Sequence, residues 1–215
     1  MFDKSVVKNV SNILKSCVEF ACKDKCRLSL HCVFFRFNEK KELIELVATD
    51  SHTLIRYINT AKSAKGLAWE LLSAIFKIEN ESFIKECELG RDSKDSKSFG
   101  ISVSLNTIKK AIKLLSMDGG KTQIILNTKE HILDATFPPY LNVIPQIRPI
   151  EECKMANFCS LNPKYLARLE TPFELCDGKE VKFLFQNTPD KSVLWKGSNI
   201  EKGFAVEAVI MPIRD

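Results

Sequence analysis

The chain has 215 residues, of which 45% are hydrophobic and 27% are charged, and its formal net charge is +5. This length accommodates one or two domains with a hydrophobic core, and the composition is that of an ordinary globular protein. No apolar run reaches the roughly 18 residues that a membrane span requires, and residues 1–5 lack the pattern of a signal peptide. These features favour a cytoplasmic protein with no membrane partner, and the modest charge argues only weakly for nucleic acid.

The chain contains eight cysteines. In a cytosolic protein we expect them to stay reduced and to behave mostly as small buried hydrophobic residues. One cluster combines cysteine with histidine and comprises Cys17, Cys22, Cys26, His31 and Cys32. Its spacings do not match the paired short-spacing template of zinc sites, so we predict no metal site and no cofactor.

The N-terminal segment has the periodicity of an amphipathic helix. Its apolar positions recur three to four residues apart and comprise Val6, Val10, Ile13, Leu14, Cys17 and Val18. Another face carries a basic stripe of Lys4, Lys8, Ser11 and Lys15. Strands are predicted over 28–37, 43–48 and 54–58, and a polar hairpin turn at 38–41 joins the first two.

Residues 60–98 have a less regular pattern. A short helix is predicted over 67–76, and 91–98 is a charged, serine-rich loop. We interpret this stretch as a helical or partly mobile insertion.

A second unit begins after this stretch with a predicted strand at 101–104. Asn106 is the predicted cap of a helix that runs to about Met117 and ends at Gly119-Gly120. Strands are predicted over 122–127 and 132–136, and the prolines of Phe-Pro-Pro-Tyr at 137–140 must interrupt regular structure. The expected buried face of the helix comprises Ile108, Ala111, Ile112 and Leu115.

A third unit has the same order of elements. A strand is predicted over 158–161, and Asn162-Pro163 begins a short helix through Leu169. Further strands are predicted over 181–185, 193–196 and 204–211. The pattern strand–helix–strands therefore occurs three times, as a weak internal repeat of about 50 to 60 residues.

Each predicted helix carries a small group of basic residues. Solvated lysines on an exposed face are the ordinary interpretation of one such group. Three groups on equivalent helices would combine into one basic surface, which suits phosphate contact without base readout. The candidate DNA-binding residues are Lys4, Lys8, Lys15, Lys109, Lys110, Lys113, Lys164 and Arg168.

Three short segments resemble the bacterial DNA polymerase III beta-subunit sliding clamps. Residues 47–54 read Val-Ala-Thr-Asp-Ser-His-Thr-Leu, where the family has Ala-Thr-Asp-Gly-His-Arg-Leu. Residues 137–145 read Phe-Pro-Pro-Tyr-Leu-Asn-Val-Ile-Pro, where the family has Phe-Pro-Asp-Tyr followed by Val-Ile/Leu-Pro. Residues 209–214 read Val-Ile-Met-Pro-Ile-Arg, and clamps usually end on Val-Met-Pro-Met-Arg. The resemblance covers most of the chain outside 60–98.

The resemblance implies a hydrophobic groove that accepts short linear motifs from polymerases and repair proteins. By position, its wall would comprise Leu30, Thr49, His52, Leu54, Pro138, Val143, Val209, Met211, Pro212 and Ile213. A histidine bonded to the backbone of a turn remains an equal alternative for His52. The family's glycine and arginine are Ser51 and Thr53 here, and its aspartate is Pro139, so the fine specificity is expected to differ. Asp215 also stands where the family often has an apolar residue.

The resemblance also implies the fold and the domain organisation. The expected class is α+β with the DNA-clamp fold, in which repeated strand–helix–strand units place helices on one face of antiparallel sheets. Residues 1–146 would match the middle clamp domain, with the insertion at 60–98, and residues 147–215 the C-terminal part of the third domain.

Two functions agree with this organisation. In the first, four copies of a three-unit chain close a ring of twelve units around double-stranded DNA, as a processivity factor that tethers a polymerase. In the second, the chain is an adaptor or decoy that binds clamp-interacting proteins without encircling DNA. We do not expect an enzyme, because no nucleophile–base pair or carboxylate dyad stands out.

Overall fold

The computed structural model describes residues 2–60, 67–79, 81–87, 99–145, 160–176, 182–184, 192–199 and 202–213. Its helices are α1 (Lys4–Phe20), α2 (Leu67–Ile75), α3 (Leu105–Asp118), α4 (Pro163–Ala167) and α5 (Glu170–Leu175), with short 3₁₀ turns at Glu81–Phe83 and Tyr140–Asn142. Its strands are β1 (Cys32–Phe37), β2 (Leu43–Thr49), β3 (Thr53–Asn59), β4 (Phe76–Ile78), β5 (Lys85–Glu86), β6 (Phe99–Ser104), β7 (Ile124–Leu126), β8 (Ile132–Leu133), β9 (Lys182–Leu184), β10 (Val193–Asn199) and β11 (Phe204–Ile210).

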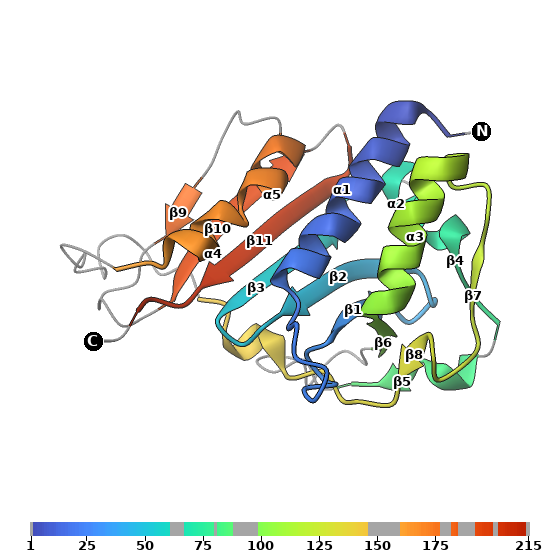
Figure 1. The fold of residues 1–215 in the computed structure, drawn as a ribbon, viewed down its shortest axis with the longest axis horizontal. Coiled ribbons are helices and arrows are strands. Elements are labelled where there is room, and N and C mark those ends of the chain that lie inside the picture. Colours follow the sequence, from blue (N-terminus) through green and yellow to red (C-terminus); the bar gives the residue numbers. More distant parts are fainter. Residues whose placement is uncertain are drawn as a thin grey trace.

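One antiparallel sheet organises the described part of the chain. Its strand order is β5-β6-β1-β2-β3-β11-β10-β9, and β8 also pairs with β6. The strands β4 and β7 form a separate parallel pair. Helices α1, α3, α4 and α5 lie on one face of the large sheet (Figure 1). The predicted α+β class, with helices on one face of an antiparallel sheet, is confirmed.

The strands alternate between two apolar layers, as the two-residue period of a strand requires. Side chains such as Phe35, Tyr57 and Val206 face the helices and form the main core. The alternate side chains of these strands point to the other face of the sheet. Together with Phe137 and Tyr140 they form a second, smaller cluster, which we call the far-face cluster: Cys32, Phe34, Val47, Leu54, Phe137, Tyr140, Leu194 and Val209. Both faces of the central strands are therefore covered by other residues.

Of the three helix caps that the sequence predicted, Gly119 and Asn162 were correct and Asn106 was not. Asp3 caps α1 by accepting a hydrogen bond from the N–H of Ser5, and Gly119 ends α3 in the left-handed conformation that glycine adopts easily. Asn162 caps α4, with Pro163 at its first turn, as expected. The cap of α3 is Ser104 and not Asn106, because the Ser104 side chain accepts from the N–H of Thr107.

Three residues of α1 and α3 also differ in burial from the expected helical patterns. Ser11 is buried and so does not belong to the exposed basic stripe of α1. Val18 and Ile112 are only partly buried against the core. The apolar stripe of each helix is therefore narrower at these positions than the sequence pattern suggested.

Several predicted strand and helix limits were wrong. The first strand begins at Cys32 and not at 28, because Arg27 O accepts from the N–H groups of Leu30 and His31 in a turn. Ser160 and Leu161 are not in a strand, and 158–159 lie outside the described residues. The helix expected through Leu169 ends at Ala167, and α5 follows it.

The region interpreted as an insertion contributes to the core. Trp69, Leu71, Leu72 and Ile75 of α2 are buried in the main core, and β4 pairs with β7. The charged loop at 91–98 lies outside the described residues. The domain boundary at 146/147 stays a prediction, because residues 146–159 also lie outside them.

Candidate functional site: an apolar junction and a basic helical face

The structure brings the first and third family-like segments together through strand pairing. Leu54 of β3 lies opposite Val209 of β11 in the register, although 155 positions separate them. Just past the strands, the N–H of Met211 donates to the carbonyl oxygen of His52 at 2.9 Å. The turn at 50–53 and the end of β11 are thus joined side by side.

The middle segment packs on the same place from the far face. Phe137 and Tyr140 belong to the far-face cluster with Leu54 and Val209. The rings of Phe34 and Phe137 stack with their centroids 4.9 Å apart. We call this meeting point the junction site and use the name for the ten predicted groove residues, whose assembly into one groove stays a prediction: Leu30, Thr49, His52, Leu54, Pro138, Val143, Val209, Met211, Pro212 and Ile213.

The ten residues of the junction site differ in their exposed fraction. Leu54 and Val209 are 2% exposed, whereas Val143 and Ile213 are 40% and 50% exposed. His52 is also exposed, Leu30, Pro138 and Met211 are half-buried, and Pro212 and Thr49 are buried. The Thr49 hydroxyl donates to Thr53 O at 2.7 Å, so it stabilises the turn. The predicted groove residues therefore include both buried and exposed apolar side chains.

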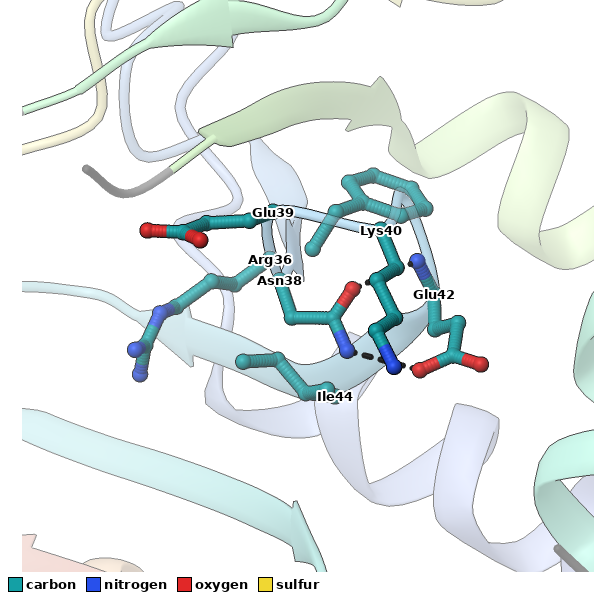
Figure 2. A pocket seen from close by; sticks show the side chains of 7 residues that line it. Arg36, Asn38, Glu39, Lys40, Glu42 and Ile44 are labelled. Atoms are coloured by element: carbon teal, nitrogen blue, oxygen red, sulfur yellow. Dashed lines mark hydrogen bonds between the residues drawn. The ribbon is translucent and has the colours of Figure 1, made fainter. Parts of the chain in front are cut away.

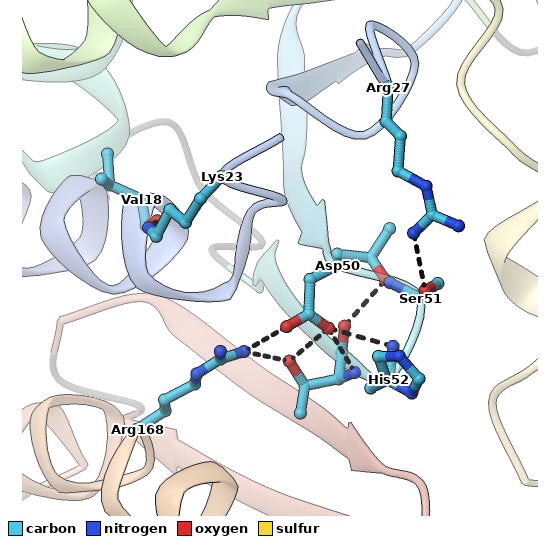
Figure 3. A network of polar contacts seen from close by, with 9 residues as sticks. Val18, Lys23, Arg27, Asp50, Ser51, His52 and Arg168 are labelled. Carbon is cyan, nitrogen blue, oxygen red and sulfur yellow. Dashed lines mark hydrogen bonds and ion pairs between the residues drawn. The ribbon is translucent and has the colours of Figure 1, made fainter. Parts of the chain in front are cut away.

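Asp50 is the centre of a polar network at the edge of the junction site (Figure 3). One carboxylate oxygen accepts from the N–H groups of His52 and Thr53, at 3.0 and 2.7 Å, and from the Thr53 hydroxyl. The other accepts from the Arg168 guanidinium at 2.6 Å. Burial acts to raise the pKa of Asp50, but the hydrogen bonds from Arg168, Thr53 and His52 outweigh it and hold this pKa below its usual value.

Tyr165 of α4 and Arg168, the residue that follows this helix, extend the network. Sequence reasoning missed the role of both. The ring of Tyr165 stacks on His52 with centroids 6.1 Å apart and planes 14° from parallel. The Arg168 guanidinium lies over the Tyr165 ring, 5.1 Å from its centroid. Arg168 is thus not the free surface cation that the sequence analysis expected. These contacts among His52, Tyr165 and Arg168 depend on the packing of α4 near the 50–53 turn, which the sequence alone does not show.

The other predicted DNA-binding residues lie on the helical face. Helices α1 and α3 pack side by side across the sheet (Figure 1), and their lysines Lys4, Lys8, Lys15, Lys109, Lys110 and Lys113 are exposed. Lys164 is exposed on α4. Lys23, which follows α1, has a lowered pKa. Burial is the main cause, and the nearby positive charges of Arg168 and Lys109 lower this pKa further. Cations from three segments are therefore close together at this end of the face.

A row of alternating charges crosses the far face of the sheet. Arg36 binds Glu45 at 2.7 Å, Arg56 binds both Glu45 and Glu207, and Lys196 binds Glu207 at 2.6 Å. The Tyr140 hydroxyl donates to the second oxygen of Glu45 at 2.5 Å. This row connects neighbouring strands and ties the 137–145 segment to the sheet. Sequence reasoning missed it as well.

A hollow of about 330 Å³ lies at the β1–β2 turn (Figure 2). This turn precedes β2, whereas the 50–53 turn follows it at the opposite end of the strand. It is lined by Arg36, Phe37, Asn38, Glu39, Lys40, Glu42 and Ile44. Asn38 and Glu42 bond to each other across it. These bonds shape a turn, and none of the residues that line the hollow belongs to the junction site.

Within the described ranges, no helix is long and apolar enough to cross a membrane. In the same ranges, no group of three or more histidine, cysteine, aspartate or glutamate side chains is placed to hold a metal ion. His31 instead bonds through its ring nitrogen to Cys22 O at 2.8 Å.

Solved structures similar to this chain are bacterial sliding clamps. The DNA polymerase III beta subunit of Pseudomonas aeruginosa matches over 98% of this chain with a TM-score of 0.57 and 14% identity. The clamp of Bartonella birtlesii bound to griselimycin matches over 97% with a TM-score of 0.54 and 17% identity. The H. pylori beta clamp in complex with diflunisal matches over 95% with a TM-score of 0.54 and 11% identity.

The chain has the fold of a bacterial DNA sliding clamp. The resemblance first seen in three short segments is therefore confirmed for the fold. The chain spans 65% or 64% of the length of these clamps. No protein-family model and no curated protein sequence matches it.

Proposed function

We propose that this chain is a sliding-clamp-like processivity factor that works by binding and not by catalysis. It binds double-stranded DNA without sequence preference on its helical face. It tethers a DNA polymerase or another DNA-acting protein through the junction site. The observation that carries this proposal is the convergence of the 47–54, 137–145 and 209–213 segments on one apolar junction, in a chain with the clamp fold.

The DNA side of the proposal depends on the exposed lysines of α1 and α3. Lysine contacts to phosphates release counterions, so affinity falls with salt, with a slope of about 0.9 per contact on a log–log scale. Replacing Lys8, Lys110 and Lys113 with glutamate removes up to three contacts. We expect the slope to drop by about 3 and DNA binding to be lost at moderate salt.

The measurement is fluorescence anisotropy with a labelled duplex at several salt concentrations. The matched control carries the same charge reversal at Lys40, Lys77 and Lys129, which are exposed on the β1–β2 turn, on β4 and after β7. Equal affinity and slope for both triple variants would contradict the assignment of the helical face.

The partner side of the proposal depends on the half-buried Met211 next to Val209 and His52. A glutamate at this position places a charge just past the end of β11, which disfavours any apolar ligand there. Griselimycin is a suitable probe, because it is bound to the Bartonella clamp. We expect the wild-type protein to bind griselimycin in calorimetry and Met211→Glu to lose this binding.

Met117→Glu provides the matched control, since Met117 is 72% exposed at the end of α3. It should bind griselimycin like the wild type. The absence of griselimycin binding to the wild-type protein, or full binding by Met211→Glu, would contradict a ligand site at the junction.

A second candidate is an adaptor that binds clamp-interacting proteins without encircling DNA. Light scattering distinguishes the two. A stable species of four chains of 24.4 kDa each supports a ring, whereas a monomer at all concentrations supports the adaptor.

A further inference from the structure

The backbone of the 50–53 turn is held in an unusual conformation by one carboxylate. Ser51 has a φ of +79°, in the left-handed region that residues other than glycine seldom adopt. Asp50 stabilises this turn because its side chain accepts from the N–H groups of His52 and Thr53. This pattern is typical of an aspartate turn. It fixes the backbone of His52, but it leaves the imidazole without a fixed direction.

Arg168 joins this turn to a helix that is distant in the sequence. Its guanidinium donates to Asp50 at 2.6 Å and to the Thr53 hydroxyl at 2.7 Å. The Arg168 and Asp50 side chains are 24% and 14% exposed, so solvent screens the pair less than an ordinary surface pair. The guanidinium also lies 5.9 Å from the centroid of the Phe20 ring at the end of α1. Three segments therefore meet on this side chain.

The same guanidinium also contacts the aromatic pair of Tyr165 and His52. It lies over the Tyr165 ring, and Tyr165 in turn stacks on His52. Asp50, Arg168, Tyr165 and His52 thus form a closed circuit, since Asp50 also bonds to the His52 backbone. Figure 3 shows the Asp50, Arg168 and His52 part of it. A planar guanidinium can bond in its plane and stack on a ring at once, whereas a lysine ammonium lacks the planar fork.

We propose that Arg168 is a positioning residue, whose ion pair with Asp50 holds the His52 and Tyr165 rings together as one aromatic wall of the junction site. His52 joins this wall to the end of β11, because the N–H of Met211 bonds to His52 O. A partner side chain that packs against stacked rings would be apolar or aromatic. This role in ligand binding rests on the proposed function, whereas the positioning of His52 does not.

The test uses the full chain and two variants that break the circuit in different ways. Arg168→Met keeps an unbranched apolar side chain and removes the guanidinium. Asp50→Asn keeps an oxygen that can accept from the N–H groups of the turn and removes the charge. Lys164→Met is the matched control, because it removes a cation from the same helix at an exposed position outside the circuit. Circular dichroism verifies that each variant is folded.

The first readout is the NMR chemical shift of the His52 ring, which depends on the ring current of the stacked Tyr165. The chain has three histidines, so a His52→Gln variant assigns the signal. We expect the His52 signal to move in Arg168→Met and in Asp50→Asn by a similar amount, and to stay in place in Lys164→Met. An unchanged His52 signal in folded Arg168→Met and Asp50→Asn would overturn the inference.

The second readout is griselimycin affinity by calorimetry. We expect about a tenfold weaker Kd for Arg168→Met and Asp50→Asn, with no further loss in the double variant, because residues in one network are not additive. If the wild type binds and both variants bind equally well, the wall has no role in binding and the inference fails. If the wild type does not bind, the proposed function fails, while the His52 signal still decides the positioning.

Discussion

Replacing Tyr140 with phenylalanine tests how the 137–145 segment is held on the sheet. The hydroxyl of Tyr140 donates to Glu45 at 2.5 Å, and Glu45 also binds Arg36 and Arg56. Phenylalanine keeps the ring, which lies 6.2 Å from Phe34 and 6.1 Å from Phe137 between centroids. The substitution therefore removes one hydrogen bond and little packing.

The size of the effect follows from burial and charge. The Tyr140 residue is 2% exposed and the Glu45 side chain 4% exposed. Burial, and to a smaller extent the nearby Glu45 carboxylate, raises the pKa of Tyr140 well above its usual value. The hydroxyl therefore keeps its proton and acts as the donor. A hydrogen bond to a buried charged group contributes about 1.5 to 3 kcal/mol, so we expect Tyr140→Phe to lower the free energy of unfolding by about 2 kcal/mol.

Urea denaturation followed by circular dichroism measures this difference, with the midpoint and slope fitted together. Tyr165→Phe is the matched control, because no hydrogen bond to its hydroxyl is found within the described residues, and it should change the free energy by less than about 0.5 kcal/mol. A loss below about 0.5 kcal/mol in Tyr140→Phe would refute the reasoning, since it would mean that the segment is not anchored on Glu45.

Three further predictions concern other parts of the structure. An added Cβ at Gly100 would lie 2.1 Å from Phe34, so Gly100→Ala should displace that ring and lower the free energy of unfolding by about 1 to 3 kcal/mol in urea titrations. Exposed Cys26 should react with a thiol reagent well before Cys32, because burial raises the pKa of Cys32 to about 12; equal rates in mass spectrometry would contradict this. The folded-state pKa of Asp50 lies below 3.8, so its contribution to stability is present at neutral pH and is lost as the pH falls through that lower value. The stability difference between wild type and Asp50→Asn should therefore be constant near neutral pH and shrink progressively as the pH falls through this lowered pKa.

Local patterns in the sequence predicted much of the fold. Alternating apolar residues marked β2, β3 and β11 to within a residue or two, and Asn162-Pro163 and Gly119 marked helix limits through their own backbone preferences. The cap of α3 was missed because Ser104 and Asn106 are both good caps, and only the observed bond to Thr107 distinguishes them. The family-like segments also predicted the clamp fold.

The polar networks could not be predicted because they depend on pairing between distant strands and helices. Arg56 and Glu207 are 151 positions apart, and Arg168 and Asp50 are 118 apart. No local period marks such a pair, so Arg168 had the same sequence signature as a solvated helix cation. Glu45 looked like an ordinary polar position of a strand, and only the register of β1, β2 and β3 shows that it lies between two arginines.

The most direct test of the central claim is to map where griselimycin binds, by backbone amide NMR of the labelled protein. A ligand site at the junction predicts that the largest shift changes occur at His52, Leu54, Met211 and Ile213, on both sides of the β3–β11 pairing. Changes centred on the β1–β2 turn around Asn38 and Glu42 (Figure 2), with none at the junction, would contradict it.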